Sequence, residues 1–399
     1  MKKTNVLPCL AILLFVCAVF FTGCNKEVES ITVTPNSIVL AVGDQYQLKA
    51  EVLPKRAPQE VEWYTSNPDV VKVDGNGVVT ALHFGVCNVK LYAGATSAAC
   101  QIVVVRKRAE HFFTVNAKGD KVQFSPGNLQ YRASSNSWRF AEHQYDYVGD
   151  GGKNIGNVPG SDNLLVSPNY DGWIDQFCWA TSGWHDERDS LNLYYFPWQY
   201  NFEEVPNQSG NLYYGFGPSA NMPDVNLTGS SARYDWGVCN AIYNPQTGTT
   251  DAAGTWRLPT SDERNYFTFF RTTVSGVRFS RAMVHGVSGF IYFPDDWDMD
   301  IHIFKDPNLT TGGFQKNVLN DNEWMLCEAE GCVFLPCAGA LGYRNTGQVW
   351  STYWKLLPGD YWTSTVVPEK GSLVYMMFCG PDGKYSNDKA AVRLVKILQ

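Results

Sequence analysis

Apolar and polar residues alternate through segment 29–107, and this two-residue period constrains the fold more than any other feature of the chain. The alternation comes in short runs: Ile31/Val33, Ile38/Leu40/Val42, Leu48/Ala50/Val52, Val61/Trp63 and Val71/Val73. Turn-forming residues separate the runs, as at Gly43-Asp44 and Asn67-Pro68. Because successive side chains of a strand point to opposite faces, the runs predict half-buried strands, and short strands at this spacing are typical of a β-sandwich.

The order of landmark residues in this segment resembles the bacterial Ig-like domain, group 2. The landmarks are Val42-Gly43-Asp44, Val61-Glu62-Trp63, Ser66-Asn67-Pro68, Gly77-Val78-Val79-Thr80-Ala81 and Gly85. The resemblance implies an Ig-like sandwich that acts as a stalk or spacer, in a family that also occurs in adhesins. Trp63 is expected to be the large aromatic residue of its core.

Cys87 and Cys100 lie on two consecutive predicted strands and alternate with apolar residues, so both are expected to face inward. A hairpin that turns near Ala93-Gly94 would place them opposite each other. Two alternatives stay open, a cross-strand disulfide or two buried free thiols.

The N-terminus has the pattern of an export signal. Lys2 and Lys3 precede an almost unbroken apolar stretch from Val6 to Phe21, which is shorter than the roughly 18 to 20 residues of a membrane-spanning helix. Phe21-Thr22-Gly23-Cys24 resembles a bacterial lipobox, which implies a signal peptide at 1–23, lipid on Cys24 and a tether at 24–28. The alternative is an ordinary signal peptide that is cut a little further on.

The residue after Cys24 is Asn25 rather than Asp, which favours the outer membrane, with a cell-surface orientation expected and a periplasmic one left open. Removal of the signal leaves eight cysteines besides Cys24 in an oxidising compartment, where many pairings are conceivable. The net charge of −7 argues against a nucleic-acid partner. The membrane, through the lipid, is therefore the first expected partner.

Segment 112–399 reads as short strands, sparse helices and long loops, which indicates an α+β domain. Thr260-Ser261-Asp262-Glu263 and Asn320-Asp321-Asn322-Glu323 are capping boxes, so helices are expected to begin there, the second one ending at Gly331. Residues 184–232 are rich in Asn, Gly, Ser, Pro and Tyr and have no sustained period. A loop of this length is usually functional or mobile.

A second resemblance covers most of 112–399. Its landmarks are Trp256-Arg257-Leu258-Pro259-Thr260, Phe334-Leu335-Pro336, Gly359-Asp360-Tyr361-Trp362-Thr363 and Val392-Arg393-Leu394-Val395. Together they look like the bacterial major-paralogous lipoprotein domain, which is related to the formylglycine-generating and sulfatase-modifying fold. The chain is thus expected to be an all-β Ig-like sandwich followed by an α+β C-type-lectin-like domain rich in loops.

Catalytic and metal-binding motifs are weak. The enzymes of the related fold use a copper-binding cysteine pair near the terminal strand, whereas Cys332 and Cys337 lie before Tyr361-Trp362, so a structural role is favoured for them. Asp295, Asp296, Asp298 and Asp300 could hold a hard cation, but a solvated turn is favoured. No catalytic residue, cofactor or metal site is predicted.

Aromatic side chains in and beside the long loop give the remaining functional hint. The candidate ligand-binding residues are Trp184, Tyr194, Tyr195, Trp198, Tyr213 and Tyr214. Such rings stack on the apolar faces of sugars. The alternative is that these aromatic side chains anchor the long loop to the sheet, which ordering a loop of this length requires. The sequence therefore predicts a non-catalytic binding or adhesion protein for a glycan or a host or cell-surface protein. The alternatives are a sulfatase-modifying-like or carbohydrate-active enzyme and a structural subunit of a surface assembly.

Overall fold

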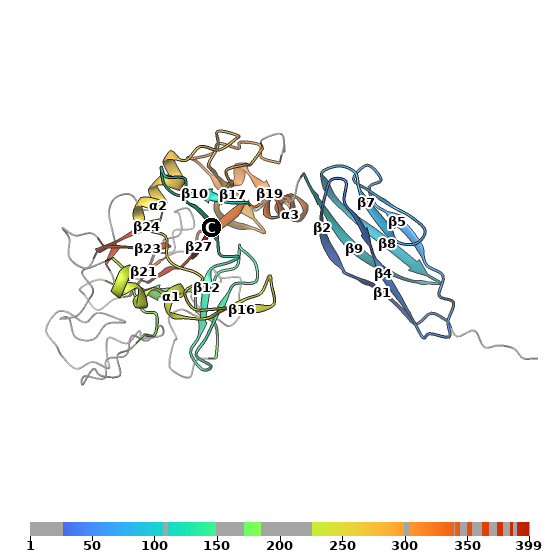
Figure 1. Ribbon diagram of the computed structural model, residues 1–399, viewed down its shortest axis with the longest axis horizontal. Coiled ribbons are helices and arrows are strands. Elements are labelled where there is room, and N and C mark those ends of the chain that lie inside the picture. Colours follow the sequence, from blue (N-terminus) through green and yellow to red (C-terminus); the bar gives the residue numbers. More distant parts are fainter. Residues whose placement is uncertain are drawn as a thin grey trace, which may run out of the picture. The chain divides into compact units, whose positions relative to one another are not determined.

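The computed structural model describes residues 27–106, 111–148, 171–184, 226–298, 303–338, 340–343, 349–352, 361–366, 373–377, 384–385 and 389–398. The chain divides into two compact units, residues 1–106 and 107–399. Both are built mainly of β-strands, and the helices of the second unit are short (Figure 1). Cys24 lies outside the described residues.

The first unit consists of three small sheets. One pairs β1 (Ser30–Thr34) with β4 (Lys49–Leu53). The largest has the order β2 (Ser37–Ala41), β9 (Thr96–Val105), β8 (Gly85–Ala93) and β5 (Glu62–Thr65). The third has the order β3 (Gln45–Gln47), β7 (Val78–Ala81) and β6 (Val71–Val73). Only the β2–β9 pair among these described strands is parallel.

The alternation in the sequence becomes the core of this unit. In β8, Cys87, Val89 and Leu91 are buried while Lys90 and Tyr92 are exposed. Inward-facing residues of all three sheets pack into one cluster. The predicted Ig-like sandwich is confirmed.

Trp63 packs against this core but is only partly buried, so it covers the edge of the sandwich instead of filling its centre. The indole lies directly over Gly77, where a Cβ would come within 2.6 Å of its Cζ2 atom. Gly77 also has a φ of +82°, which strains any other L-residue. Two independent constraints therefore require glycine at this turn.

The register of the β8–β9 hairpin corrects the expected position of the two cysteines. Cys87 pairs with Ile102 and Cys100 with Val89, because the turn is Gly94-Ala95 and closes with Ala93 opposite Thr96. Cys87 and Cys100 are thus diagonal neighbours, and both are buried free thiols. Burial, with a smaller contribution from Cys87, raises the pKa of Cys100 to about 11, so that thiol stays protonated at neutral pH.

The described strands of the second unit form four sheets. The first has the order β10 (Phe113–Thr114), β11 (Lys121–Phe124) and β27 (Val395–Leu398). The second has the order β12 (Leu129–Arg132), β13 (Ser137–Phe140), β15 (Ile242–Asn244) and β16 (Thr249–Asp251). The third has the order β19 (Val318–Leu319), β17 (Phe279–Val284), β18 (Val287–Tyr292) and β20 (Val333–Pro336).

The fourth sheet is the largest of this unit. Its order is β22 (Val349–Thr352), β21 (Ala340–Tyr343), β26 (Lys389–Ala391), β23 (Tyr361–Val366), β24 (Leu373–Met377) and β25 (Lys384–Tyr385), with β14 (Gln176–Cys178) also paired to β26. Because β27 pairs with β11, residues from the two ends of the unit meet in one sheet.

Both predicted capping boxes form. In α2 (Ser261–Asn265), Thr260 and Glu263 cap each other, and a π-helical turn, η2 (Tyr266–Phe270), follows. In α3 (Asp321–Ala329), Asn320 and Glu323 do the same. The other helical segments are η1 (Gly229–Tyr234), α1 (Trp236–Cys239) and η3 (Phe314–Lys316). None of the helices in the described residues has the length and apolar character that crossing a membrane requires.

Tryptophan forms much of one core of the second unit. Trp138, Trp179, Trp236, Trp256 and Trp362 all belong to a single buried cluster. Four of these indole N–H groups have a hydrogen-bond acceptor, those of Trp179, Trp236, Trp256 and Trp362. For example, Trp179 donates to the Thr363 carbonyl at 2.9 Å, and Trp362 donates to the Phe177 carbonyl at 2.7 Å. A satisfied donor removes the main cost of burying an indole.

The acidic segment after β18 serves the fold. Asp295 accepts a 2.6 Å hydrogen bond from the fully buried Arg271 and another from the Thr114 amide. Asp296 lies 3.3 Å from His111. Asp300 lies outside the described residues, and among the described ones no group of three potential ligands could hold a metal ion.

We expect Gly77→Ala to destabilise the Ig-like unit by about 3 kcal/mol, because left-handed backbone strain and the clash with Trp63 act together. Gly75→Ala is the matched control, since its Cβ would meet nothing within 4 Å and its φ is not positive. Hydrogen–deuterium exchange of peptides spanning β6 to β8, measured at increasing urea, reports the difference. Equal protection in the two variants would contradict the prediction.

We expect Asp295→Asn to destabilise the second unit by about 3 kcal/mol, because it leaves the Arg271 cation buried without its counter-charge. The melting temperature of this unit should fall by about 5–10 °C. Asp262→Asn, on the exposed side of the first turn of α2, should change it little. Calorimetry of the full chain measures both, and an unchanged transition in Asp295→Asn would show that the ion pair is not stabilising.

Candidate functional site

The structure describes one of the six aromatic residues predicted to bind a ligand. Trp184 is half-buried, with the Arg233 guanidinium 4.1 Å above its ring and Tyr234 packed edge-on at 5.2 Å. Arg233 therefore occupies a ring face that a sugar would need. Tyr194, Tyr195, Trp198, Tyr213 and Tyr214 lie outside the described residues. The ligand-binding role of these six residues stays a prediction.

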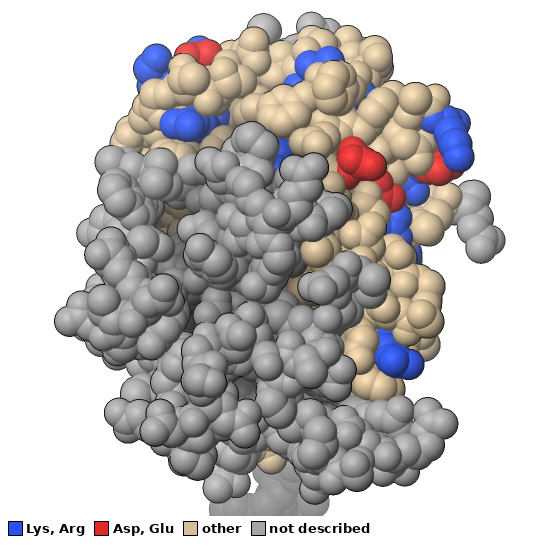
Figure 2. All heavy atoms as spheres, turned by 90° about the vertical axis from the view of Figure 1, so that its left-hand side faces the viewer, with Lys and Arg blue, Asp and Glu red and all other residues tan. Residues whose placement is uncertain are grey.

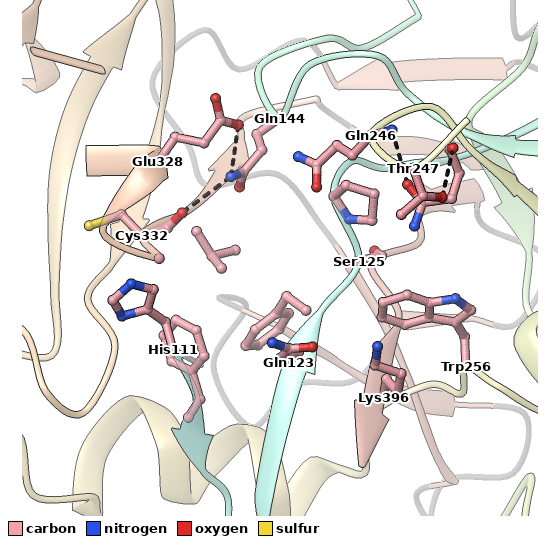
Figure 3. A pocket seen from close by; sticks show the side chains of 16 residues that line it. His111, Gln123, Ser125, Gln144, Gln246, Thr247, Trp256, Glu328, Cys332 and Lys396 are labelled. Atoms are coloured by element: carbon pink, nitrogen blue, oxygen red, sulfur yellow. Dashed lines mark hydrogen bonds between the residues drawn. The ribbon is translucent and has the colours of Figure 1, made fainter. Parts of the chain in front are cut away.

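A different part of the second unit has the shape of a binding site. A cavity of about 420 Å³ opens between the C-terminal end of α3, strand β11 and the β15–β16 turn (Figure 3). This volume lies within the range of small-molecule sites. Segments that are distant in the sequence meet around it, from His111 on one side to Lys396 on the other.

Side-chain amides dominate the polar part of the lining. The four are Gln123, Gln144, Asn244 and Gln246. Gln144 and Asn244 use both ends of their amides in bonds within the protein, whereas Gln123 and Gln246 can present a donor and an acceptor to a ligand whose hydroxyls also do both. The apolar part of the lining comes from Phe113, Phe124, Pro126 and Val333.

Gln144 is the best-fixed of these amides. Its Oε1 accepts from the Phe334 amide at 2.8 Å and from Arg393 Nη2 at 2.7 Å. Its Nε2 donates to Glu328 Oε1 at 3.1 Å and to the Cys332 carbonyl at 3.2 Å. With both ends committed to the protein, Gln144 forms a rigid wall.

Arg393 supplies the charge behind that wall. It is fully buried, and burial lowers its pKa to about 10, opposed by the charges of Tyr361 and Glu328. The guanidinium therefore stays protonated at neutral pH. Burial raises the pKa of Glu328, while the hydrogen bond from Gln144 and the positive charges of His143 and Arg393 lower it. Gln144 thus links a buried cation to a partly buried carboxyl at the cavity surface.

The opposite wall is the turn between β15 and β16. The Asn244 side chain holds this turn, accepting from the Gln246 amide at 3.1 Å and donating to Asp251 at 3.2 Å. Gln246 and Thr247 are exposed and border the cavity (Figure 3). The Thr247 hydroxyl bonds to the Asn244 carbonyl and to Thr249 within the turn, so Gln246 is the side chain of this pair that can meet a bound molecule.

Trp256 and Lys396 close the remaining side. Lys396 Nζ lies 5.3 Å from the centre of the Trp256 ring, and the Trp256 indole donates to Asp251 at 2.9 Å. The indole is 4% exposed, so it supports the cavity and offers a ligand little more than its edge.

Cys332 borders this cavity, but Cys337 does not share its position. The two residues flank β20, whose extended backbone separates them by roughly 16 Å. Cys332 is buried, and Cys337 is half-buried against a second apolar cluster. The described structure therefore does not bring these two thiols together in one site, which was one of two arrangements that would favour the enzyme alternative; the other is a pair of carboxylates facing across a cleft.

Sequence reasoning missed this cavity because no local spacing marks it. Only the capping motifs at Asn320 and Gly331 pointed to α3, which carries Glu328 to the wall. Gln123, Gln246 and Lys396 stand in ordinary strand and turn segments and become neighbours only through the tertiary fold.

On the face drawn in Figure 2, the basic side chains of the described residues are scattered, and acidic side chains lie next to some of them. The described part of this face has no block of a single charge, which a polyanionic partner would favour.

Comparison with known proteins gives a match for the first unit. Residues 27–104 match the family model of the bacterial Ig-like domain, group 2. No curated protein matches the chain.

Solved structures give partial similarities. One is a bacterial Ig-like domain-containing GH10 xylanase from termite gut, with 25% identity over 19% of this chain and 20% of that one, at a TM-score of 0.15. Another is the S-layer protein SbsC, domains 4 and 5, with 16% identity over 20% of this chain and 52% of that one, at a TM-score of 0.18. The chain spans less than two thirds of either structure. From the family match, residues 27–104 are a bacterial Ig-like domain of group 2.

Proposed function

We propose that this chain is a lipid-anchored protein of the outer membrane, exposed at the cell surface, whose second unit binds a glycan. The Ig-like domain acts as the spacer between the lipid on Cys24 and the binding unit. The observation that carries the binding role is the cavity of about 420 Å³ with four side-chain amides in its lining.

The chemistry of the lining favours a sugar over other small ligands. A sugar hydroxyl donates one hydrogen bond and accepts others, and an amide meets both needs at one position. The C–H faces of a sugar ring fit the apolar lining of Phe113, Phe124 and Val333. The mixed charges, Glu328 and Lys396 on facing sides, suit a neutral ligand better than a polyanion.

We also propose that the second unit has the C-type-lectin-like α+β fold. Its support is that the landmark residues of that resemblance have structural roles here. Trp256 and Leu258 are buried, Arg257 forms a bidentate pair with Glu263 at 2.8 and 2.6 Å, and Trp362 and Arg393 are fully buried. Close packing constrains the residues of a core, so proteins with related folds are expected to share them.

The support for the anchor is the apolar stretch that ends at Phe21-Thr22-Gly23-Cys24. Several acyl chains, each contributing about 0.8 kcal/mol per buried CH₂, hold a protein on a membrane stably. The Ig-like domain begins at about residue 27, directly after the proposed attachment point.

We expect Cys24→Ala to abolish the incorporation of radiolabelled palmitate in a diderm bacterial host. Cys17→Ala is the control, since Cys17 would leave with the signal peptide and the product should keep its label. Labelling of both variants would contradict lipidation at Cys24.

A glycan array followed by titration calorimetry tests the binding role. Gln246→Ala should weaken the affinity for the best glycan about threefold to tenfold, because one neutral hydrogen bond is lost from an exposed side chain. Thr250→Ala, exposed on β16 and outside the lining, should leave the affinity unchanged. No saturable binding to any glycan, or equal affinities of the two variants, would contradict the proposal.

A further inference from the structure

Helix α3 ends in a motif that joins two cysteines. The Gly331 amide donates to the Glu328 carbonyl at 3.0 Å, and the Cys332 amide donates to the Cys327 carbonyl at 2.9 Å. Gly331 has a φ of +80°. These two bonds around a left-handed glycine define a Schellman motif, whose outer bond connects Cys327 and Cys332.

The motif brings the side chains of these two positions together. In a Schellman motif the residues at the ends of the outer bond commonly form an apolar contact, and here both residues are cysteine. Both are buried, Cys327 at 0% and Cys332 at 1% exposure. The backbone hydrogen bond limits the Cα–Cα separation to at most about 7 Å, close to the range that disulfides span.

A second observation supports the proximity of the thiols themselves. The pKa of Cys332 is raised, first by burial and then by a side-chain hydrogen bond with Cys327. Cys337, by contrast, is separated from Cys332 by the length of β20. Cys327 is therefore the natural partner of Cys332.

We propose that Cys327 and Cys332 form a disulfide in the exported protein. This inference rests on the export that the proposed function includes, because an oxidising compartment preserves such bonds. The step is thiol–disulfide exchange: one cysteine thiolate attacks a protein or small-molecule disulfide, forms a mixed disulfide with it and releases the first donor thiolate. The second cysteine thiolate then attacks the cysteine sulfur of that mixed disulfide and releases the second donor thiolate. Two cysteines lose two protons and two electrons, and the donor disulfide is reduced to two thiols.

The position gives the bond a role in the candidate site. Cys332 borders the cavity, with its carbonyl toward Gln144. The closed loop contains Glu328 and Gly331, which also line the cavity. A disulfide would therefore fasten the end of α3 to the start of β20 and hold the wall that carries Glu328.

Peptide mapping of the full chain, isolated from the cell envelope, tests the pairing. The unfolded protein is alkylated with N-ethylmaleimide without reductant and cut with a glutamyl endopeptidase, for which Glu328 and Glu330 lie inside the loop, and with chymotrypsin, for which Phe334 lies between Cys332 and Cys337. The Cys327 and Cys332 peptides should remain joined, two hydrogens lighter than the separate peptides, and should separate on reduction. Cys327→Ser should lose the link, with Cys332 becoming alkylated, and Cys239→Ser, changed in α1, should retain it.

Treatment of the purified full chain with oxidised glutathione tests the Cys327–Cys332 pairing independently of export. Formation of the link there supports the pairing even if Cys24 carries no lipid. Alkylation of both cysteines in envelope-derived and in glutathione-treated protein would overturn the proposal. A link from Cys332 to any other cysteine would overturn it as well.

Discussion

The buried cation of Arg393 is the interaction on which the second unit most depends. Removing a guanidinium from water costs several kcal/mol, so the groups around it must be held in place. Arg393 donates to Gln144 at 2.7 Å and lies 3.4 Å from Asn128, while Gln144 also accepts from the Phe334 amide. One charge thus joins the segment before β27, two loops from early in the unit and strand β20. The wall of the cavity is a consequence of this network.

The aromatic content of the chain has a structural explanation in the described residues. Indoles supply large apolar area, and their single donor must be satisfied when buried. Trp179, Trp236 and Trp362 each donate to a backbone carbonyl of a neighbouring segment. Trp179 and Trp362 therefore join the neighbourhood of β14 to β23, and Trp236 joins α1 to the segment after β14. At Trp184 the Arg233 guanidinium lies over one face of the ring, and the expectation that the aromatic side chains near the long loop bind ligand stays a prediction.

Short sequence patterns predicted the strands and the helix starts well, but they predicted the candidate site poorly. Alternation predicted a β-sandwich, which the family resemblance specified as Ig-like, and the capping boxes predicted the starts of α2 and α3. Alternation and capping boxes are signals that lie within a few residues. The predicted register of the β8–β9 hairpin was wrong. Its turn is Gly94-Ala95, one residue later than expected, and a shift of the turn by one residue changes every cross-strand pair. The cavity could not be predicted, since contacts such as Arg393 with Gln144 span 249 positions and depend on the whole fold.

The two sides of the cavity differ in how firmly they are held. On the α3 side, the amide of Gln144 is fully used by Arg393, Phe334 and Glu328, so it can shape a ligand's surroundings without rearranging. On the β15–β16 side, Asn244 fixes the backbone of the turn while Gln246 stays exposed. A rigid wall reduces the entropy lost on binding, and adaptable polar groups opposite it provide selectivity. Related chains that bind different ligands should therefore differ in the β15–β16 turn. Substitutions of the residues behind Gln144 would remove hydrogen bonds from the buried Arg393 cation.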